Sequence, residues 1–249
     1  MEKSETDEMF SRSRMLMGEA AFSALRRSRV ILFGVGGVGG WAAEALVRTG
    51  LGSLTIVDFD RVAPSNINRQ MPAVYGNIGM SKVEAACSRL LAINPSAEIV
   101  GIDSIYSPDT ASEFRLGEYD YVIDAIDSLR DKALLINNAT RSDAVLFSSM
   151  GAALKTDPTK VSVAEFWKVG GCRLAAALRR RFRNSGEFPA RKFKCVYSPE
   201  LVENRIMASE RSEASPINKP VVNGSLMQIT CTFGMTLASL VVSDLMSKH

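Results

Sequence analysis

The sequence predicts an α/β fold in which helices cover both faces of a doubly wound, mostly parallel sheet. Between residues 29 and 150, short apolar runs alternate with segments whose apolar residues repeat at helical spacing. Strands that alternate with helices form parallel sheets with right-handed crossovers. After residue 151 the pattern changes, and residues 160–166 alternate as a strand with one solvated face would. We therefore expect antiparallel strands to extend the sheet in the last part of the chain.

Each predicted element rests on a local signal. The first strand, at 29–33, runs into glycines, and the helix at 41–49 stops at Gly50, a residue suited to a helix C-terminus. Ser81 and Glu84 form a capping box at the start of a helix that ends near residue 93, before an Asn-Pro pair. The other expected strands are 53–58, 97–102, 121–125, 144–148 and 160–166, and the other expected helices are 9–27, 129–141 and 173–182.

The remaining segments set the domain division. Residues 184–220 predict a loop, because Pro, Ser and charged residues are frequent there. Residues 221–243 carry no charge and could span a bilayer, but polar residues interrupt them, so a buried strand-helix or interface element is favoured over membrane association. We divide the chain into an N-terminal helical segment (1–28), a core (29–150), and a part (151–249) with the strand extension, a basic crossover segment and a C-terminal strand-helix.

Composition excludes several classes of chemistry. With 46% hydrophobic and 23% charged residues, the chain is ordinary for a soluble α/β protein. The only histidine is the last residue, His249, which argues against a Ser-His-Asp triad and against a histidine-rich metal site. Four cysteines occur without a C-x-x-C pair, so no zinc site is expected. The acidic, polar N-terminus is no secretory signal, and a reducing cytoplasm is the expected location.

A glycine-rich turn between the first strand and the first helix indicates a nucleotide site. Its glycines, which allow close approach of the backbone to a phosphate at a helix N-terminus, are Gly34, Gly36, Gly37 and Gly39. Asp58, at the end of the second strand, is placed to bind ribose hydroxyls, as in Rossmann-like folds. The pattern alone says only that a nucleotide binds, and a glycine turn that serves tight packing is the alternative.

Three further features favour phosphate chemistry over hydride transfer. The loop after the second strand carries Asp60, Asn66, Arg69 and Gln70, and a guanidinium group suits phosphate oxygens. Lys82 lies in the first turn of its helix, where a cation opposes the helix dipole unless an anion accompanies it. Asp127 follows a strand end, where it could hold Mg²⁺. The alternatives are a solvated loop, a surface lysine and a helix-capping aspartate.

The ordered motifs GVGGVG, VDFD, SNINRQ, GMSK and VIDAID resemble those of the ubiquitin-activating-enzyme-like (E1-like) adenylating enzymes over residues 29–150. This family includes the activators of the molybdopterin and thiamine pathways. The resemblance implies a Rossmann-like, ATP-binding core of the activating-enzyme fold, and a homodimer in which Arg12, or else Arg14, reaches the partner's site. The implied contacts are ribose to Asp58, phosphates to Asn66, Arg69 and Lys82, and Mg²⁺ to Asp127.

Within this family, further segments resemble the tRNA threonylcarbamoyladenosine dehydratases: WAAEALVRTGLGSLTIVD, YVIDAIDSLR, DPTKVSV, LAAALRRRF and CVYSPE. This branch activates the threonyl carboxylate of a modified adenosine in tRNA with ATP and Mg²⁺, and closes it to a cyclic form. The implied catalytic residues are Arg12, Arg69, Lys82 and Asp127. The missing C-x-x-C pairs disfavour relatives that keep zinc.

A basic segment offers a place for the RNA. It contains Arg173, Arg179, Arg180, Arg181, Arg183, Arg191, Lys192 and Lys194. Such a patch suits a phosphate backbone, although a solvated basic helix and loop is the plain alternative. Cys195 is a candidate nucleophile, because Lys192 and Lys194 could lower its pKa, but ring closure needs no thiol.

Three alternative functions stay open at this stage. The first is adenylation of the C-terminus of a ubiquitin-like sulfur carrier, in which a sulfur-transfer protein would be a partner. The second is an NAD-dependent oxidoreductase, which would leave Arg69, Lys82 and Asp127 without a joint purpose. The third is a nucleotide-binding module without turnover, which should tolerate Asp127→Ala and Arg69→Ala.

Overall fold

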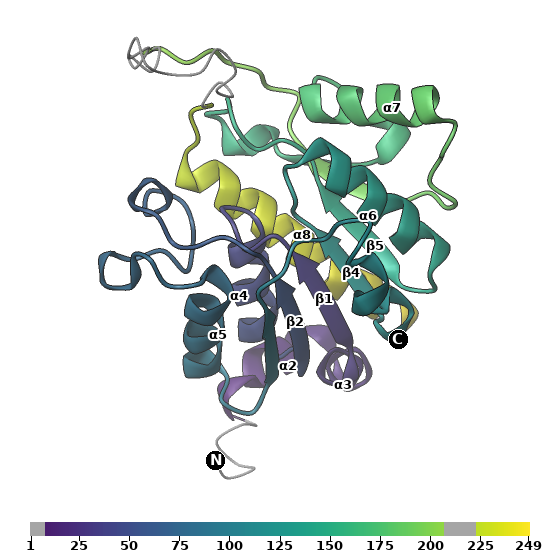
Figure 1. Cartoon of the computed structure of the whole chain (residues 1–249). Helices are drawn as coiled ribbons and strands as arrows, with labels where there is room; N and C mark the ends of the chain where they lie inside the picture. Colours follow the sequence, from purple (N-terminus) through teal and green to yellow (C-terminus); the bar gives the residue numbers. More distant parts are fainter. Residues whose placement is uncertain (1–7, 207–222) are drawn as a thin grey trace.

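A seven-stranded sheet forms the centre of the computed structural model, which describes residues 8–206 and 223–249 (Figure 1). The strand order is β3-β2-β1-β4-β5-β7-β6. All neighbours pair in parallel except β6, which is antiparallel to β7. The strands are β1 (Arg29–Phe33), β2 (Ser53–Val57), β3 (Glu98–Ile102), β4 (Tyr121–Asp124), β5 (Val145–Ser149), β6 (Ser162–Glu165) and β7 (Lys194–Tyr197). The predicted fold class is confirmed, with one antiparallel strand in the extension.

Helices cover both faces of this sheet. One face carries α2 (Ser11–Met17), α3 (Glu19–Arg27), α4 (Gly39–Thr49), α5 (Lys82–Ile93) and α8 (Met227–Lys248), and the other carries α6 (Leu129–Arg141) and α7 (Arg173–Ser185). Short 3-10 segments lie at Pro64–Asn66, Tyr75–Asn77, Ala111–Phe114, Leu116–Glu118, Pro158–Lys160 and Phe166–Lys168.

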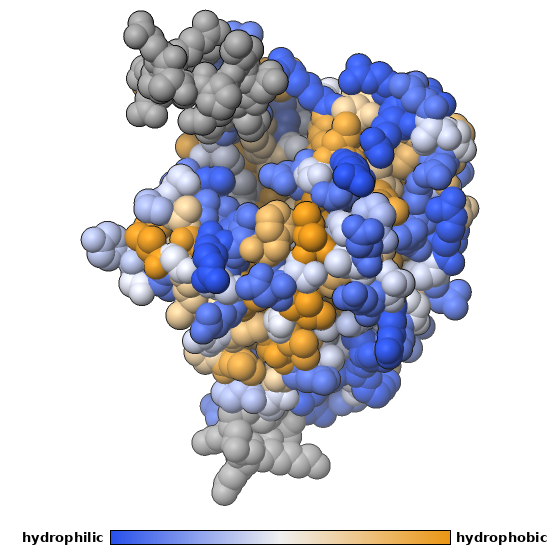
Figure 2. Space-filling model, viewed as in Figure 1, coloured by the Kyte–Doolittle hydropathy of each residue, from blue (hydrophilic) through white to orange (hydrophobic). Residues whose placement is uncertain are grey.

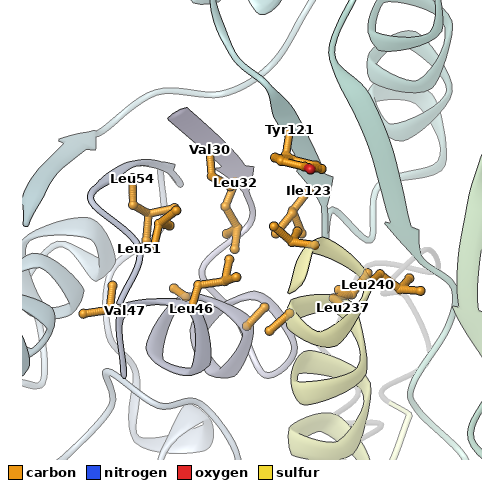
Figure 3. Close-up of a cluster of buried hydrophobic side chains, with 14 of the residues drawn as sticks. Val30, Leu32, Leu46, Val47, Leu51, Leu54, Tyr121, Ile123, Leu237 and Leu240 are labelled. Atoms are coloured by element: carbon orange, nitrogen blue, oxygen red, sulfur yellow. The ribbon is translucent and has the colours of Figure 1, made fainter. Parts of the chain in front are cut away.

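The alternation of side chains along the strands creates two hydrophobic cores. Val30 and Leu32 of β1 face the α4 side, whereas Ile31 and Phe33 face the α6 side. Figure 3 shows the first core, in which side chains of α4 and α8 pack beneath β1, β2 and β4. Because β1 is buried on both faces, its whole length is apolar, as expected for a central parallel strand.

Two details at the helix termini differ from the sequence prediction. The helix expected over 9–27 is divided at Gly18, whose φ of 78° ends α2 and begins α3. Ser81 is the N-cap residue of α5, but its buried hydroxyl makes no hydrogen bond among the described residues, so the predicted capping box is wrong. The bounds of α6 match the prediction, because an uninterrupted helical pattern sets them.

A parallel strand lies inside the segment predicted to be a loop. β7 pairs with β5 in parallel and with β6 in antiparallel register, so the chain crosses the α6 side through α7 and returns to the sheet. The strand is only four residues long, and charged residues precede it. The sequence pattern therefore did not predict it. The sheet therefore continues through the part of the chain after residue 150.

The uncharged C-terminal stretch forms the helix α8. It packs mainly on α4, and Gly234 permits the close crossing, because a Cβ there would lie 2.5 Å from the carbonyl oxygen of Val38. α8 is long and apolar enough to cross a membrane, but half of its most apolar window is buried inside the protein. The helix part of the prediction is correct. No strand precedes α8 at residues 223–226, and residues 221 and 222 lie outside the described residues.

Candidate functional site

One cavity of about 920 Å³ opens at the carboxyl ends of β1, β2, β4 and β5. Ligands of open α/β sheets bind at these strand ends, and the volume lies within the usual range for ligand pockets, about 300–1,000 Å³. Figure 2 shows this face of the molecule hollowed between α7 and the loops that follow β2. The predicted site residues that line the cavity are Gly34, Gly36, Gly37, Asp58, Asp60, Asn66, Arg69, Gln70, Lys82, Asp127 and Arg173.

The glycine turn has no room for side chains at its two ends. Gly34 has a φ of 90°, and a Cβ there would lie 2.8 Å from the carbonyl oxygen of Ala125. A Cβ at Gly39 would lie 1.9 Å from the carbonyl oxygen of Gly34. The turn is therefore pressed against the loop after β4, and the N-terminus of α4 lies behind it, where an anion is favoured.

Asp58 ties the glycine turn to the end of β2. Its carboxylate accepts hydrogen bonds from the backbone N–H of Val35 at 2.7 Å and of Asp60 at 2.9 Å. Burial raises the pKa of Asp58 above its ordinary value, although the charge of Lys82 opposes the shift. Each carboxylate oxygen retains a lone pair for a further donor, such as a ribose hydroxyl.

Lys82 and Asp60 form an ion pair at the mouth of the site. The ammonium lies 2.7 Å from the Asp60 carboxylate, and the lysine side chain is 6% exposed against 51% for the aspartate. Lys82, the cation at the start of α5, is thus paired with a carboxylate of the protein itself, that of Asp60. An ammonium group carries three N–H donors, so Lys82 keeps donors for a second anion.

The loop after β2 brings the other polar residues to the same cavity. The Arg69 guanidinium is held by the carbonyl oxygen of Ser65 at 2.9 Å and by the Asn68 side chain at 2.8 Å. The Asn66 side chain caps its own 3-10 segment by accepting from the N–H of Ala63. Gln70 is buried, yet its Oε1 has no hydrogen-bond partner among the described residues. This acceptor is therefore available to a ligand.

Asp127 lies exposed at the cavity, and its carboxylate contacts no donor among the described residues. The N-cap of α6 is Ser128, so the capping role considered for Asp127 is wrong. Beneath it, the buried Asp124 and Lys132 hold Ile126 from both sides: the N–H of Ile126 donates to Asp124 at 3.1 Å, and Lys132 donates to the carbonyl oxygen of Ile126 at 2.9 Å. These contacts fix the loop that carries Asp127.

Arg12 and Arg14 do not line the cavity. Both lie on α2, at the opposite end of the sheet from the glycine turn (Figure 1). Arg14 forms an ion pair with Glu19. Neither arginine is brought to the site of its own chain, so a role in the site requires a second copy.

Cys195 is fully buried in β7, and burial raises its pKa well above the ordinary value. The cation that opposes this shift is Lys132, not Lys192 or Lys194 as the sequence suggested, and both of these lysines are exposed to solvent. A buried thiol with a raised pKa is a poor nucleophile. The geometry therefore gives no support to the activation that we predicted for Cys195.

The basic segment divides into structural and exposed arginines. Arg179 donates to the carbonyl oxygen of Val169 at 2.9 Å, and Arg191 donates to that of Thr140 at 3.0 Å, so both side chains hold the backbone. Arg191 is exposed as well as bonded, and the other exposed cations are Arg173, Arg180, Arg181, Arg183, Lys192 and Lys194. Phe182 and Phe193 are packing residues of the core and are not available to stack on bases.

Sequence reasoning missed Lys132 and Lys155, two buried lysines near the cavity. Lys132 is fully buried against Asp124, and Lys155, which is 4% exposed, lines the cavity. Neither position carries a local signal, because a lysine in a helix or a loop is normally a solvated residue. Their burial is set by contacts with distant parts of the chain.

The cavity defines the class of the protein: a nucleotide-binding α/β protein whose site carries cations suited to a polyphosphate. The model of the ThiF family matches residues 10–246, and the chain belongs to this family. The resemblance seen in the sequence is thereby confirmed.

Named relatives match over most of the chain. The tRNA threonylcarbamoyladenosine dehydratase of Escherichia coli (strain K12) is 34% identical over 251 residues, which cover 96% of this chain and 94% of the relative. The protein of the same name from Haemophilus influenzae is 36% identical, with 92% and 89% covered. The crystal structure of the E. coli enzyme in complex with ATP superposes with a TM-score of 0.84 at 33% identity, and covers 97% of this chain and 95% of that one.

Proposed function

We propose that this chain is an ATP-dependent tRNA threonylcarbamoyladenosine dehydratase. The observation that carries the proposal is the full-length likeness to an E. coli enzyme of that name, which was crystallised with ATP. The likeness includes the basic crossover segment and α8, not only the nucleotide-binding core. This supports the dehydratase over a sulfur-carrier activator, a dehydrogenase or a module without turnover. A tRNA substrate also implies a cytoplasmic place of action.

The reaction has two steps. An oxygen of the threonyl carboxylate attacks the α-phosphorus of ATP, the bond from that phosphorus to the bridging oxygen breaks, and pyrophosphate leaves. The neighbouring carbamoyl group, which loses a proton, then attacks the acyl carbon, and AMP leaves as the ring closes. The sum is loss of water from the substrate, driven by cleavage of ATP. No histidine is needed, since AMP and pyrophosphate are the leaving groups.

The protein contributes position and charge. In the proposed complex Asp58 binds the ribose, and the N–H groups of the glycine turn face a phosphate. Arg69 and Lys82 neutralise charge that builds on the departing pyrophosphate, and such preorganised cations are most effective in a cavity that excludes water. The support is their shared position on one cavity.

Asp127 is the proposed ligand of Mg²⁺. No group of three or more His, Cys, Asp or Glu that could hold a metal occurs among the residues in the described part of the chain. Mg²⁺ fits here, because it is usually bound by one or two carboxylates together with substrate phosphates and keeps much of its water. The exposed carboxylate of Asp127, which no protein donor occupies, matches that need. When bound, the ion would shield the charge of the phosphates.

A homodimer is the proposed assembly, with Arg12 reaching the site of the partner copy. Met15 and Leu16 on the same short helix are 84% and 81% exposed, which is unusual for large apolar side chains and indicates a covered surface. A sulfur-transfer protein is a second candidate partner, although ring closure does not require one. The exposed Arg180, Arg181 and Arg183 of α7 are the proposed contact with the tRNA backbone.

The decisive experiment is mass spectrometry of tRNA nucleosides from a strain that lacks this protein. Loss of the cyclic adenosine, with accumulation of its open form, is the expected result. The purified protein should also catalyse ATP–pyrophosphate exchange that depends on modified tRNA. ATP–pyrophosphate exchange that depends instead on a ubiquitin-like sulfur carrier would show that the protein adenylates such a carrier.

A further inference from the structure

Three lysine residues in the described part of the protein are at most 5% exposed: Lys82, Lys132 and Lys155. Lys82 pairs with Asp60 at 2.7 Å, and Lys132 pairs with Asp124 at 2.8 Å. Lys155 has no carboxylate within ion-pair distance among the described residues. Its ammonium donates to the carbonyl oxygen of Glu200, a neutral acceptor.

The Glu200 carboxylate, which could have paired with Lys155, has other partners. It accepts from the backbone N–H groups of Thr156 at 2.7 Å and Asp157 at 2.9 Å, and it lies 3.5 Å from Lys160. A buried charge without a counter-ion is unfavourable, and burial lowers the pKa of Lys155 accordingly. Such a residue is suited to an anion that arrives with a ligand.

The lysine lines the part of the cavity that lies after the end of β5. This part is formed by the segment after β5 and the start of α7, including Gly151, Leu154, Lys155, Cys172 and Arg173. No carboxylate lines it. All four acidic residues of the cavity wall follow β2 or β4: Asp58, Asp60, Asp127 and Asp131.

The wall beside Lys155 is held in a fixed conformation. Leu154 has a φ of 57°, a left-handed conformation that non-glycine residues rarely adopt. Its N–H donates to the carbonyl oxygen of Gly224 at 2.9 Å, and its own carbonyl oxygen accepts from Val202 at 3.0 Å. Strain of this kind persists where surrounding contacts impose it, and it is frequent at ligand sites.

Arg173 is the second cation of this part of the cavity. It is the first residue of α7, and its side chain makes no hydrogen bond or ion pair with the described residues. We propose that Lys155 and Arg173 bind the carboxylate of the acyl substrate, the group that the nucleotide activates. This assignment rests on the proposed function and adds the substrate's own subsite to it.

A carboxylate fits better than either kind of phosphate. The nucleotide phosphates have cations of their own, Arg69 and Lys82, beside the glycine turn. A phosphodiester of the RNA backbone would have to reach a lysine that is 4% exposed. A carboxylate on a flexible side chain can enter, and a guanidinium and an ammonium group can hold both of its oxygens. One oxygen would then be presented to the nucleotide.

The test compares tRNA carrying the threonylcarbamoyl group as free acid with the same tRNA as its methyl ester, in the absence of ATP. Wild-type protein should bind the acid at least about tenfold more tightly, since a charge-assisted hydrogen bond contributes that much. Lys155→Met should reduce the preference to less than about threefold while ATP-Mg affinity is unchanged. Lys155→Arg should restore part of it.

Two controls separate binding from folding. Lys160→Met removes a half-exposed lysine of the same loop, which does not line the cavity, and should leave the preference intact. Lys155→Met should change the melting temperature little, because removal of a buried charge that has no counter-ion offsets the hydrogen bond that the Glu200 carbonyl oxygen loses. If Lys155→Met does not fold, the same comparison of acid and ester is made with Arg173→Gln, a substitution at an exposed position.

Two outcomes would overturn the subsite. One is an unchanged preference for the acid in both variants. The other is a loss of ATP affinity in Lys155→Met, which would assign the lysine to the phosphates. Wild-type protein that binds the acid selectively but never releases pyrophosphate would instead refute the proposed function and leave the subsite standing.

Discussion

The Lys132 ammonium lies 2.8 Å from the Asp124 carboxylate, and neither side chain is exposed to solvent. The same carboxylate accepts from the Ser148 hydroxyl at 2.6 Å and from the N–H of Ile126, while Lys132 also donates to the Ile126 carbonyl oxygen. The pair therefore joins β4, β5 and α6 beneath the loop that carries Asp127. Removal of one partner would leave an uncompensated charge in the core.

Lys132→Met should destabilise the protein by about 3–5 kcal/mol, the usual cost of breaking a buried ion pair from one side. Urea unfolding measures this. Lys160→Met, at a half-exposed position, should change the free energy of unfolding by less than about 0.5 kcal/mol. Equal effects of the two substitutions would mean that the buried pair contributes nothing specific.

Gly34→Ala should cost about 1–3 kcal/mol, because alanine at a φ of 90° is strained and its Cβ would meet the carbonyl oxygen of Ala125. ATP affinity should fall as the turn moves. The matched control is Gly76→Ala, where a Cβ would meet nothing within 4 Å. Thermal melting and calorimetry with ATP would check both expectations, and a tolerated alanine at 34 would contradict the close packing of the turn.

The features predicted from sequence are those set by neighbours along the chain. The glycine turn and Asp58 could be placed because parallel strands end at one edge of a sheet, so residues just after β1 and β2 must meet. Lys155 and Lys132 could not be placed, because their burial depends on segments far away: Glu200 for one, Asp124 and β5 for the other. β7 was missed for a similar reason, since its four residues become a strand only through pairing with β5 and β6.

Asp127→Ala should lower the rate of adenylation by at least about 100-fold, because a metal ion that shields a phosphoryl group contributes several kcal/mol. Folding stability should be unchanged, since the carboxylate contacts no donor in the described part of the chain. Pyrophosphate release at increasing Mg²⁺ concentration measures the effect, with the exposed Asp143→Ala as the control. A variant of normal activity would remove Asp127 from the metal site.

Affinity for a nucleoside should depend on the ionisation of Asp58. Burial raises the pKa of this carboxyl group, and its charged form is the better acceptor for a ribose hydroxyl. Binding should therefore be complete at neutral pH and be lost as the pH falls through the raised pKa. Adenosine is the suitable probe because it lacks phosphates that titrate. Fluorescence titration at several pH values should show this loss in the wild type and a weak, pH-independent affinity in Asp58→Asn.

The exposed arginines of α7 should determine how steeply tRNA binding falls with salt. Each phosphate contact contributes about 0.7–0.9 to the slope of log affinity against log salt concentration. Replacing Arg180, Arg181 and Arg183 by Gln should therefore lower the slope by about 2–3. Arg179 is kept, because its hydrogen bonds to Phe166 and Val169 hold the fold. Arg26→Gln with Arg27→Gln, at the exposed end of α3, is the control, and an equal loss of slope there would mean that the protein's general charge, not α7, binds the RNA.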